Sequence, residues 1–157
     1  MTGTPLDSAL WEADRHRQAL DSALQGWRGA PAQNLAALES DAAKVRIVDQ
    51  LLYRFTKLQD ALGARLVPAT LARLAEPFED WSMIDRLNRL EKLGLLQVEA
   101  WLRWREIRNR LAHEYPEADD ARLEAILAAI DAAAEMASAY RHWRDRLEEL
   151  TRRDTAG

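Results

Sequence analysis

The stretch KVRIVDQLLYRFTKLQDALG, residues 44–63, carries apolar side chains at steps of three or four positions. That spacing lines them up on one side of an α-helix, because the helix turns once every 3.6 residues. The stripe consists of Val45, Val48, Leu52, Phe55, Leu58 and Leu62. The segment KLQD at 57–60 contributes to the polar face. We therefore expect a long amphipathic helix, beginning near Asn34 or Ser40 and ending before Pro68.

Stripes of the same kind recur on both sides of this stretch. Proline and glycine supply the start and stop signals, with Thr4-Pro5 opening a first helix and with Gly26 and Gly29-Ala30-Pro31 closing it. A capping sequence at Ser82 opens a later helix. Further helices are expected over residues 85–93, 98–112 and 123–147. Residues 69–76, between two prolines, leave room for one or two helical turns within a connection.

Composition agrees with an all-α fold. Of the 157 residues 28 are Ala and 24 are Leu, whereas Val and Ile together number only 9. Good helix formers therefore greatly outnumber the β-branched residues that favour strands. We expect an up-and-down bundle of four main helices plus one or two short helices. Residues 1–153 would form a single domain and residues 154–157 a flexible tail.

Charge and residue usage exclude several classes of protein. The chain contains no cysteine, which removes disulfides, thiol catalysis and Cys-ligated metals from consideration. No apolar run approaches the ~18 residues of a membrane span, so we expect a soluble, cytoplasmic protein. The net charge of -4 argues against general nucleic-acid coating but leaves room for a local basic site.

A local basic site is present in WLRWREIRNRLAHEYP, residues 101–116. Residues 101–110 hold four arginines and one glutamate, a local charge of +3 on an acidic chain. On a helical wheel Arg108 lies about 40° from Trp104 and therefore on the apolar stripe. A guanidinium there needs an anion, a carboxylate or a subunit interface, because burying it unpaired is costly. Water can account for the other three arginines, which project away from the stripe.

His113 falls about 180° from Trp104 on the same wheel, so in a regular helix it would point away from Arg108. Two alternatives bring the side chains together. Either the helix ends near Ala112, as Pro116 encourages, or the residues meet across a two-fold dimer. Arginine and histidine in one cleft suit metal-free RNA cleavage, since arginine binds phosphate, histidine transfers protons and the RNA 2′-hydroxyl is the nucleophile. We predict no metal and no cofactor, because the residues supply no ligand set.

The segment RNRLAHEY, residues 108–115, resembles the R-x4-H-x-Y motif of HepT-type toxins in the HEPN superfamily, in which a polar residue typically follows the arginine. Residues 44–63 and 82–94 are also similar to small bacterial HEPN-like proteins. The resemblance covers roughly residues 44–116. It implies a HEPN-like helical bundle for the whole domain.

The resemblance implies a metal-independent endoribonuclease toxin of a toxin–antitoxin pair. Arg108 and His113 would be the catalytic pair, contributed by both subunits of a homodimer, and Asn109 would orient or bind phosphate. Tyr115 would accept AMP from an MntA-like nucleotidyltransferase antitoxin. That AMPylation would block the cleft with a competing phosphate and a base. The implied partners are an RNA substrate, a second copy of the chain and the nucleotidyltransferase, with no membrane.

One alternative from a different functional class stays open. HEPN-like bundles can lose nuclease action, and the chain would then be a non-catalytic, substrate-binding or regulatory partner of a minimal nucleotidyltransferase. A bare structural bundle is a third interpretation. It leaves the position of Arg108 on the apolar stripe unexplained.

Overall fold

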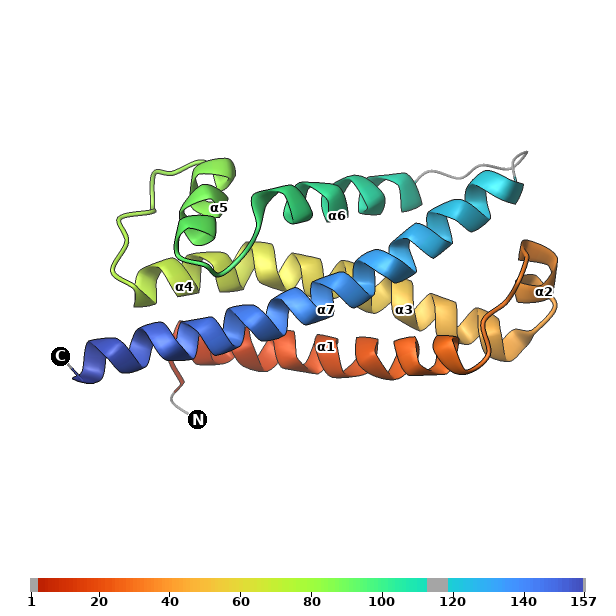
Figure 1. Ribbon diagram of the computed structural model, residues 1–157, viewed down its shortest axis with the longest axis horizontal. Helices are drawn as coiled ribbons and strands as arrows, with labels where there is room; N and C mark the ends of the chain where they lie inside the picture. The colour runs from red at the N-terminus through yellow and green to blue at the C-terminus, as the bar shows by residue number, and fades with distance from the viewer. Residues whose placement is uncertain (1–2, 113–118, 157) are drawn as a thin grey trace.

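The computed structural model describes residues 3–112 and 119–156, and every regular element in those residues is a helix. In chain order the elements are α1 (Pro5–Gly29), α2 (Leu35–Glu39), α3 (Ala42–Ala61), the π-helix η1 (Leu62–Leu66), α4 (Val67–Arg73), α5 (Met83–Lys92), α6 (Val98–Leu111) and α7 (Asp119–Ala156). Four long helical segments, namely α1, α3–α4, α6 and α7, pack into a bundle (Figure 1). The predicted all-α bundle with additional short helices is confirmed.

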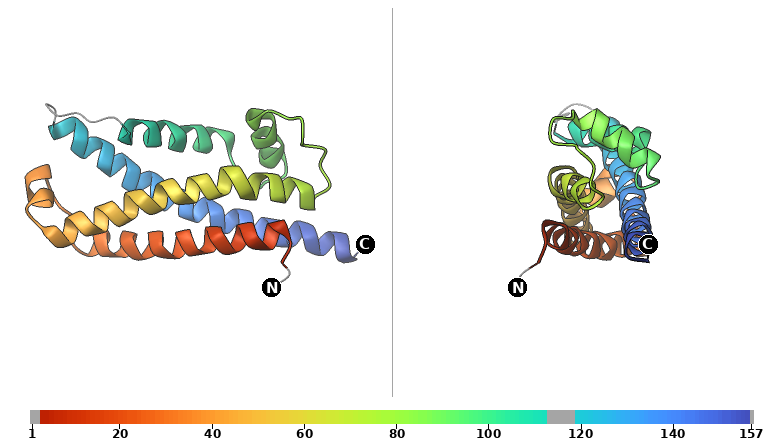
Figure 2. Two further views of the ribbon diagram at one scale, coloured as in Figure 1. Left: turned by 180° about the vertical axis from the view of Figure 1, so that it is seen from behind. Right: turned by 90° about the vertical axis from the view of Figure 1, so that its left-hand side faces the viewer.

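Successive long segments alternate in direction, so the start of α1 and the end of α7 lie at the same end of the bundle (Figure 1). α1 packs most extensively against α3, while α7 contacts α1, α3 and α6. Figure 2 shows α5 lying across one end of the bundle and α2 at the opposite end. Contacts of α6 with α7 and α5 hold it on the outer side of the bundle.

Side-chain caps mark the start of α1, α3 and α5. The side chain of Thr4 accepts a hydrogen bond from the Asp7 amide at 3.1 Å, and Asp7 accepts one from the Thr4 amide at 3.1 Å. This capping box satisfies two backbone donors that the helix cannot satisfy itself. Asp41 caps α3 and Ser82 caps α5 through a side-chain oxygen that accepts hydrogen bonds from backbone amides.

Pro68 does not end the second long helix, contrary to the sequence prediction. The chain continues from α3 through the π-helix η1 into α4, and Pro68 occupies the second position of α4. A proline lacks an N–H group, and its ring collides with the carbonyl group four residues earlier in a regular α-helix. The wider π-turn, in which the Val67 amide donates to the Leu62 carbonyl, changes the spacing just before the proline. Burial of Val67 and Leu71 favours continuation of the helix past Pro68.

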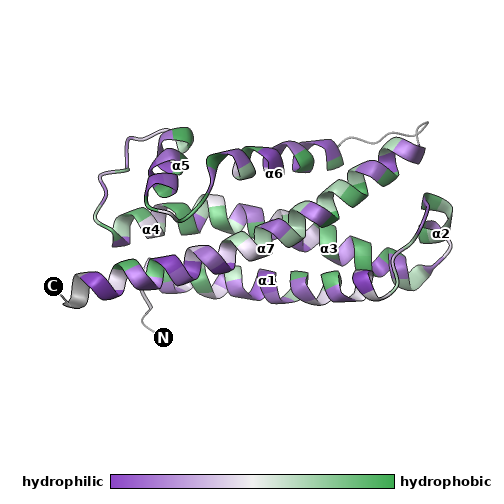
Figure 3. Ribbon diagram, viewed as in Figure 1, coloured by the Kyte–Doolittle hydropathy of each residue, from purple (hydrophilic) through white to green (hydrophobic). Residues whose placement is uncertain are grey.

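The core is built from the predicted stripes. Figure 3 shows hydrophobic and hydrophilic residues alternating along each long helix, as an amphipathic helix requires. The largest fully buried side chains include Phe55, Trp104, Tyr140 and Trp143. The indole N–H of Trp143 donates to the hydroxyl of Thr70 at 3.2 Å, so these two buried polar groups satisfy each other.

The C-terminal helix is longer than the sequence prediction. α7 extends to Ala156, so three of the four residues assigned to a tail continue the helix. The reason is local, because neither proline nor glycine occurs between Pro116 and Gly157 to stop it. None of the helices in the described parts of the chain combines the length and hydropathy needed to cross a bilayer.

Candidate functional site

The last turn of α6 carries Arg108 and Asn109. α6 is anchored at its start by the Val98 amide, which donates to the Glu91 carboxylate at 2.9 Å. Its inner face holds Trp101 and Trp104, whose rings meet edge to face with centroids 6.3 Å apart. These two buried indoles fix the rotation of α6 about its axis and thereby the direction in which its arginines project.

Gly63 of η1 allows α6 to approach the second long helix closely. A Cβ atom built on Gly63 would lie 3.1 Å from two ring atoms of Trp101. That distance is shorter than an ordinary van der Waals contact, so any side chain here would displace the indole. One helical turn before Gly63 lies Asp60, which brings a carboxylate of α3 beside the end of α6.

The Arg108 guanidinium forms an ion pair with the Asp60 carboxylate, and a second hydrogen bond joins Nη2 to Oδ2 at 3.4 Å. The Arg108 side chain is 36% exposed and that of Asp60 is 49% exposed. Of the three partners that the sequence left open, the described structure supplies a carboxylate within the same chain. The guanidinium lies at the edge of the apolar stripe, where water and ligands can reach it.

The remaining polar residues of α6 lie on its outer surface. Asn109 is exposed. Arg103 pairs with Glu135 of α7, and Arg110 lies 3.8 Å from Glu106 one turn earlier. Arg105 is exposed. Arg103, Arg105 and Arg110 are thus surface residues, in agreement with the sequence interpretation, and Arg108 is the arginine of this cluster that reaches α3.

His113 and Tyr115 lie outside the described residues, so the structure does not test their predicted roles. α6 ends at Leu111 with Ala112 as its C-terminal cap. This end agrees with one of the two alternatives left by the helical wheel, a helix that ends near Ala112. The other alternative, contact across a dimer, is not tested by a single chain.

The other two histidines have partners within the fold. The Nδ1 atom of His16 on α1 lies 2.9 Å from a guanidinium nitrogen of Arg54. Burial, and to a smaller extent the positive charge of Arg54, lower the pKa of His16 below its usual value. His142 on α7 has Nε2 2.8 Å from the Gly94 carbonyl oxygen. Across the described residues, no cluster of three or more His, Asp or Glu side chains is arranged to hold a metal ion.

A groove of about 1060 Å³ opens beside α6. Its lining includes Leu102 and Trp104 from α6, Glu135 and His142 from α7, and the chain between α5 and α6. Neither Arg108 nor Asn109 is among the lining residues. The groove and the arginine therefore belong to different surfaces of the same helix.

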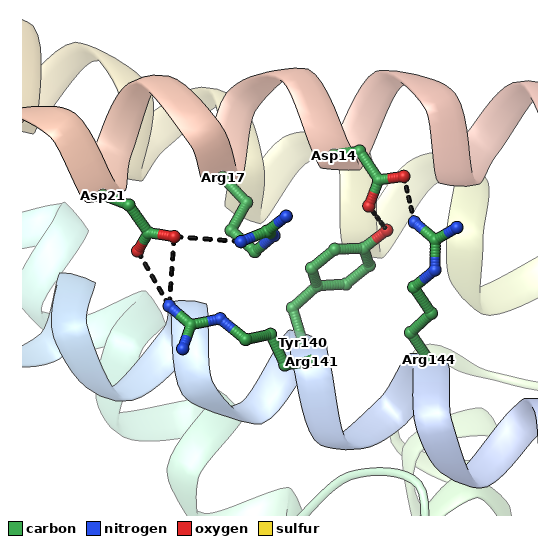
Figure 4. Close-up of polar contacts among 6 residues, drawn as sticks. All are labelled: Asp14, Arg17, Asp21, Tyr140, Arg141 and Arg144. Carbon is green, nitrogen blue, oxygen red and sulfur yellow. Dashed lines mark hydrogen bonds and ion pairs between the residues drawn. The ribbon is translucent and has the colours of Figure 1, made fainter.

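A polar network joins α1 to α7 (Figure 4). The buried Tyr140 hydroxyl donates to Asp14 at 2.7 Å, and Arg144 pairs with the same carboxylate. Burial and the hydrogen bond to Asp14 raise the pKa of Tyr140 well above its usual range. Burial alone would raise the pKa of Asp14, but the hydrogen bonds from Arg144 and Tyr140 outweigh it and hold that pKa below its usual value.

The second half of this network centres on Asp21. Its carboxylate accepts hydrogen bonds from Arg17 of the same helix at 2.9 Å and from Arg141 of α7 at 3.0 Å (Figure 4). Perturbed pKa values mark active sites when they occur in a cleft, but they also arise in structural ion-pair networks. Here Asp14 and Asp21 of α1 each pair with an arginine of the facing helix α7, so we interpret the network as a structural seam.

Comparison with known protein families, with curated proteins and with solved structures finds no match to this chain. The resemblance of residues 108–115 to the HEPN motif therefore rests on the sequence of that segment.

Asp60 is the residue of this site that sequence reasoning missed. The segment KLQD at 57–60 was recognisable only as part of a polar helix face. Asp60 and Arg108 are 48 positions apart, and their pairing depends on how α3 and α6 are rotated against each other. The one available signal was the requirement for an anionic partner at Arg108, which does not say which of 26 acidic residues supplies it.

Proposed function

We propose that the chain is a metal-independent endoribonuclease toxin that acts as a homodimer and is neutralised by AMP transfer to Tyr115 from a nucleotidyltransferase antitoxin. The observation that carries the proposal is the accessible Arg108 guanidinium at the end of α6, followed in the sequence by Asn109, His113 and Tyr115. An arginine held at a helix end and still 36% exposed can bind a phosphate through its planar fork.

The chemistry requires no protein nucleophile. The 2′-oxygen of the RNA attacks the adjacent phosphorus and the 5′-oxygen leaves, which gives a 2′,3′-cyclic phosphate and a 5′-hydroxyl. Arg108 stabilises the charge that develops on the phosphate oxygens. His113 of one copy accepts the 2′-hydroxyl proton, and His113 of the second copy donates a proton to the leaving oxygen.

The pair between Arg108 and Asp60 sets a condition on this mechanism. A phosphate that binds Arg108 has to replace or share the Asp60 carboxylate. Since both side chains are partly exposed, this exchange costs little, because exposed ion pairs contribute only about 0–1 kcal/mol. Asp60 therefore orients the guanidinium without blocking it.

The decisive experiment is RNA cleavage in the presence of EDTA. Purified protein is compared with Arg108→Ala and His113→Ala variants, and Arg105→Ala serves as the matched control because it removes another exposed arginine of α6. We expect the first two substitutions to lower the cleavage rate by roughly 10²–10⁴-fold. The control should cut at the parent rate.

Equal activity in all four samples, or none in any of them at high protein concentration, would contradict catalysis. The antitoxin part is tested separately by intact mass after mixing with the transferase and ATP. The proposal requires an added AMP that is lost in Tyr115→Phe.

The groove beside α6 favours one second candidate, a non-catalytic binding partner of the nucleotidyltransferase. Its apolar lining includes the exposed Leu102, and it lies away from Arg108. In that case the Arg108→Ala variant should still form a stable complex with the transferase, and neither it nor the parent chain should alter RNA.

A further inference from the structure

The exposed face of α3 leads directly to the Asp60–Arg108 pair. Its residues recur at steps of four and three positions, which places them on one side of the helix. All of them are exposed: Arg46, Gln50, Tyr53, Lys57 and Asp60. The last residue of this stripe holds Arg108. The stripe is therefore a surface path along α3 to the candidate site.

Tyr53 is the prominent residue of this path. Its side chain is 55% exposed, although aromatic side chains usually bury most of their surface. Two cations lie over the ring, with Lys57 Nζ 5.6 Å and Arg54 Cζ 5.4 Å from its centroid. An accessible aromatic ring with two positive charges close to it is thus held on the helix surface.

The charge of this surface differs from that of the chain. Arg46, Arg54 and Lys57 contribute three positive charges, and Asp49 contributes one negative charge. Asp60 is matched by Arg108 and adds nothing to the balance. The face is locally positive by two charges on a chain whose net charge is -4. An anionic partner is therefore attracted to this face more than to the average surface.

Aromatic rings combined with cations are the usual means of binding single-stranded nucleic acid. Bases stack on the ring, and the cations neutralise the flanking phosphates. Tyr53 and Asp60 are seven residues apart, which corresponds to about 10 Å along the helix axis. That length matches roughly three stacked nucleotides, each of which rises about 3.4 Å.

We propose that Tyr53, with Lys57 and Arg54, forms a docking platform for single-stranded RNA. A base stacks on Tyr53 about three nucleotides from the phosphate that Arg108 binds. The inference rests on the proposed function, because it takes Arg108 as the phosphate-binding group. It adds the chemical class of the substrate, an unpaired strand, and the path of that strand along α3.

Trp11 of α1 offers a matched comparison. It is 58% exposed, and Arg15 lies 4.7 Å from its ring centroid. This pair has the same chemistry as Tyr53 and its cations but lies on α1, whereas Arg108 pairs with α3. If RNA binding at Tyr53 depends on the position of the ring on α3, and not merely on an exposed aromatic ring, then substitution of Trp11 should not change RNA binding.

The test measures binding of a fluorescein-labelled single-stranded RNA by anisotropy at several salt concentrations. The full-length His113→Ala variant is the parent, so that the RNA is not cut. Tyr53→Leu should weaken binding by about 5- to 100-fold, and Tyr53→Phe should retain it, because the ring is what stacks. Lys57→Gln should reduce the salt dependence of log K by about 0.7. Trp11→Leu should bind like the parent.

An affinity of Tyr53→Leu within about twofold of the parent, or an equal loss in Trp11→Leu, would overturn the platform. So would the absence of RNA binding by the parent, or a Tyr53→Leu variant that loses only binding to a nucleotidyltransferase. Failure of the proposed function is distinguishable. If the wild-type chain cuts no RNA but binds it in a way that depends on Tyr53, the proposed nuclease activity is wrong and the docking platform is retained.

Discussion

The Arg108 guanidinium of α6 is bound by the Asp60 carboxylate of α3, and both side chains remain partly exposed. An exposed pair of this kind contributes little to the stability of the fold, on the order of 0–1 kcal/mol. Its main consequence concerns Arg108 itself, because the carboxylate orients the guanidinium and competes with any other anion for it. The pair therefore links the packing of two helices to the availability of the Arg108 side chain.

Asp60→Asn should increase RNA binding several-fold, because the amide keeps the shape of the side chain and removes the competing charge. The free energy of unfolding should change by less than about 1 kcal/mol. Glu135→Gln is the matched control, since it breaks the ion pair between Arg103 and α7 instead. RNA anisotropy and urea unfolding measure the two effects. Identical RNA affinities for the two variants would show that Asp60 does not control Arg108.

The sequence sufficed to predict the bundle and the need of Arg108 for an anionic partner, but not the partner. Apolar stripes such as Val48, Phe55 and Leu58 are buried as expected, because burial of apolar area dominates the energetics of each helix. The identity of Asp60 depends on the rotation of α3 against α6. That rotation follows from packing between residues far apart in the chain, such as Gly63 against Trp101.

Pro68 illustrates a local rule that tertiary packing overrides. Proline usually ends a helix, and the prediction from sequence placed the end before it. The π-helix η1 instead widens the backbone before Pro68, and the helix continues with Val67, Leu71 and Thr70 buried. The sequence shows the proline, but the apolar surface against which α4 packs is supplied by other parts of the chain.

Gly63→Ala should destabilise the protein, although alanine is the better helix former. The new Cβ would lie 3.1 Å from the Trp101 ring, which is itself packed edge to face against Trp104 and cannot move freely. Overpacking of this kind costs about 1–3 kcal/mol, more than the roughly 1 kcal/mol gained in helix propensity. Gly29→Ala is the control, because nothing lies within 4 Å of its Cβ position. A higher free energy of unfolding in urea for Gly63→Ala than for Gly29→Ala would contradict the close approach of Gly63 to the Trp101 ring.

Tyr140→Phe should lower the free energy of unfolding by about 1–2 kcal/mol. The substitution removes the buried hydroxyl that donates to Asp14 and leaves the carboxylate with Arg144 as its remaining partner in this network. Tyr53→Phe removes an equivalent hydroxyl from an exposed side chain and should change the stability by less than about 0.5 kcal/mol. Chemical denaturation of both variants gives the comparison. Equal losses would show that the hydrogen bond to Asp14 contributes nothing specific.

The free energy of unfolding should decrease as the pH falls, because of His16 of α1, which lies beside Arg54 of α3. Burial and the charge of Arg54 lower the pKa of His16 in the folded chain below the value of about 6.5 expected in the unfolded chain. Lys57 acts in the same direction, while Glu12, which lies 3.8 Å from Nε2, acts against it. Between the lowered folded-state pKa of His16 and about pH 6.5, the unfolded chain binds more protons than the folded chain, so acid favours unfolding.

The contribution of His16 is therefore fully present above about pH 6.5 and is lost as the pH falls through the lower folded-state pKa. Asp14 also has a lowered pKa, but its carboxylate protonates only below about pH 4, outside this window. His16→Gln keeps a neutral polar group beside Arg54 at every pH. Urea midpoints measured between about pH 7.5 and pH 5 should fall more steeply for the wild type than for His16→Gln. Parallel curves would mean that the positive charge of protonated His16 is tolerated beside Arg54, and the predicted loss of stability in acid would be wrong.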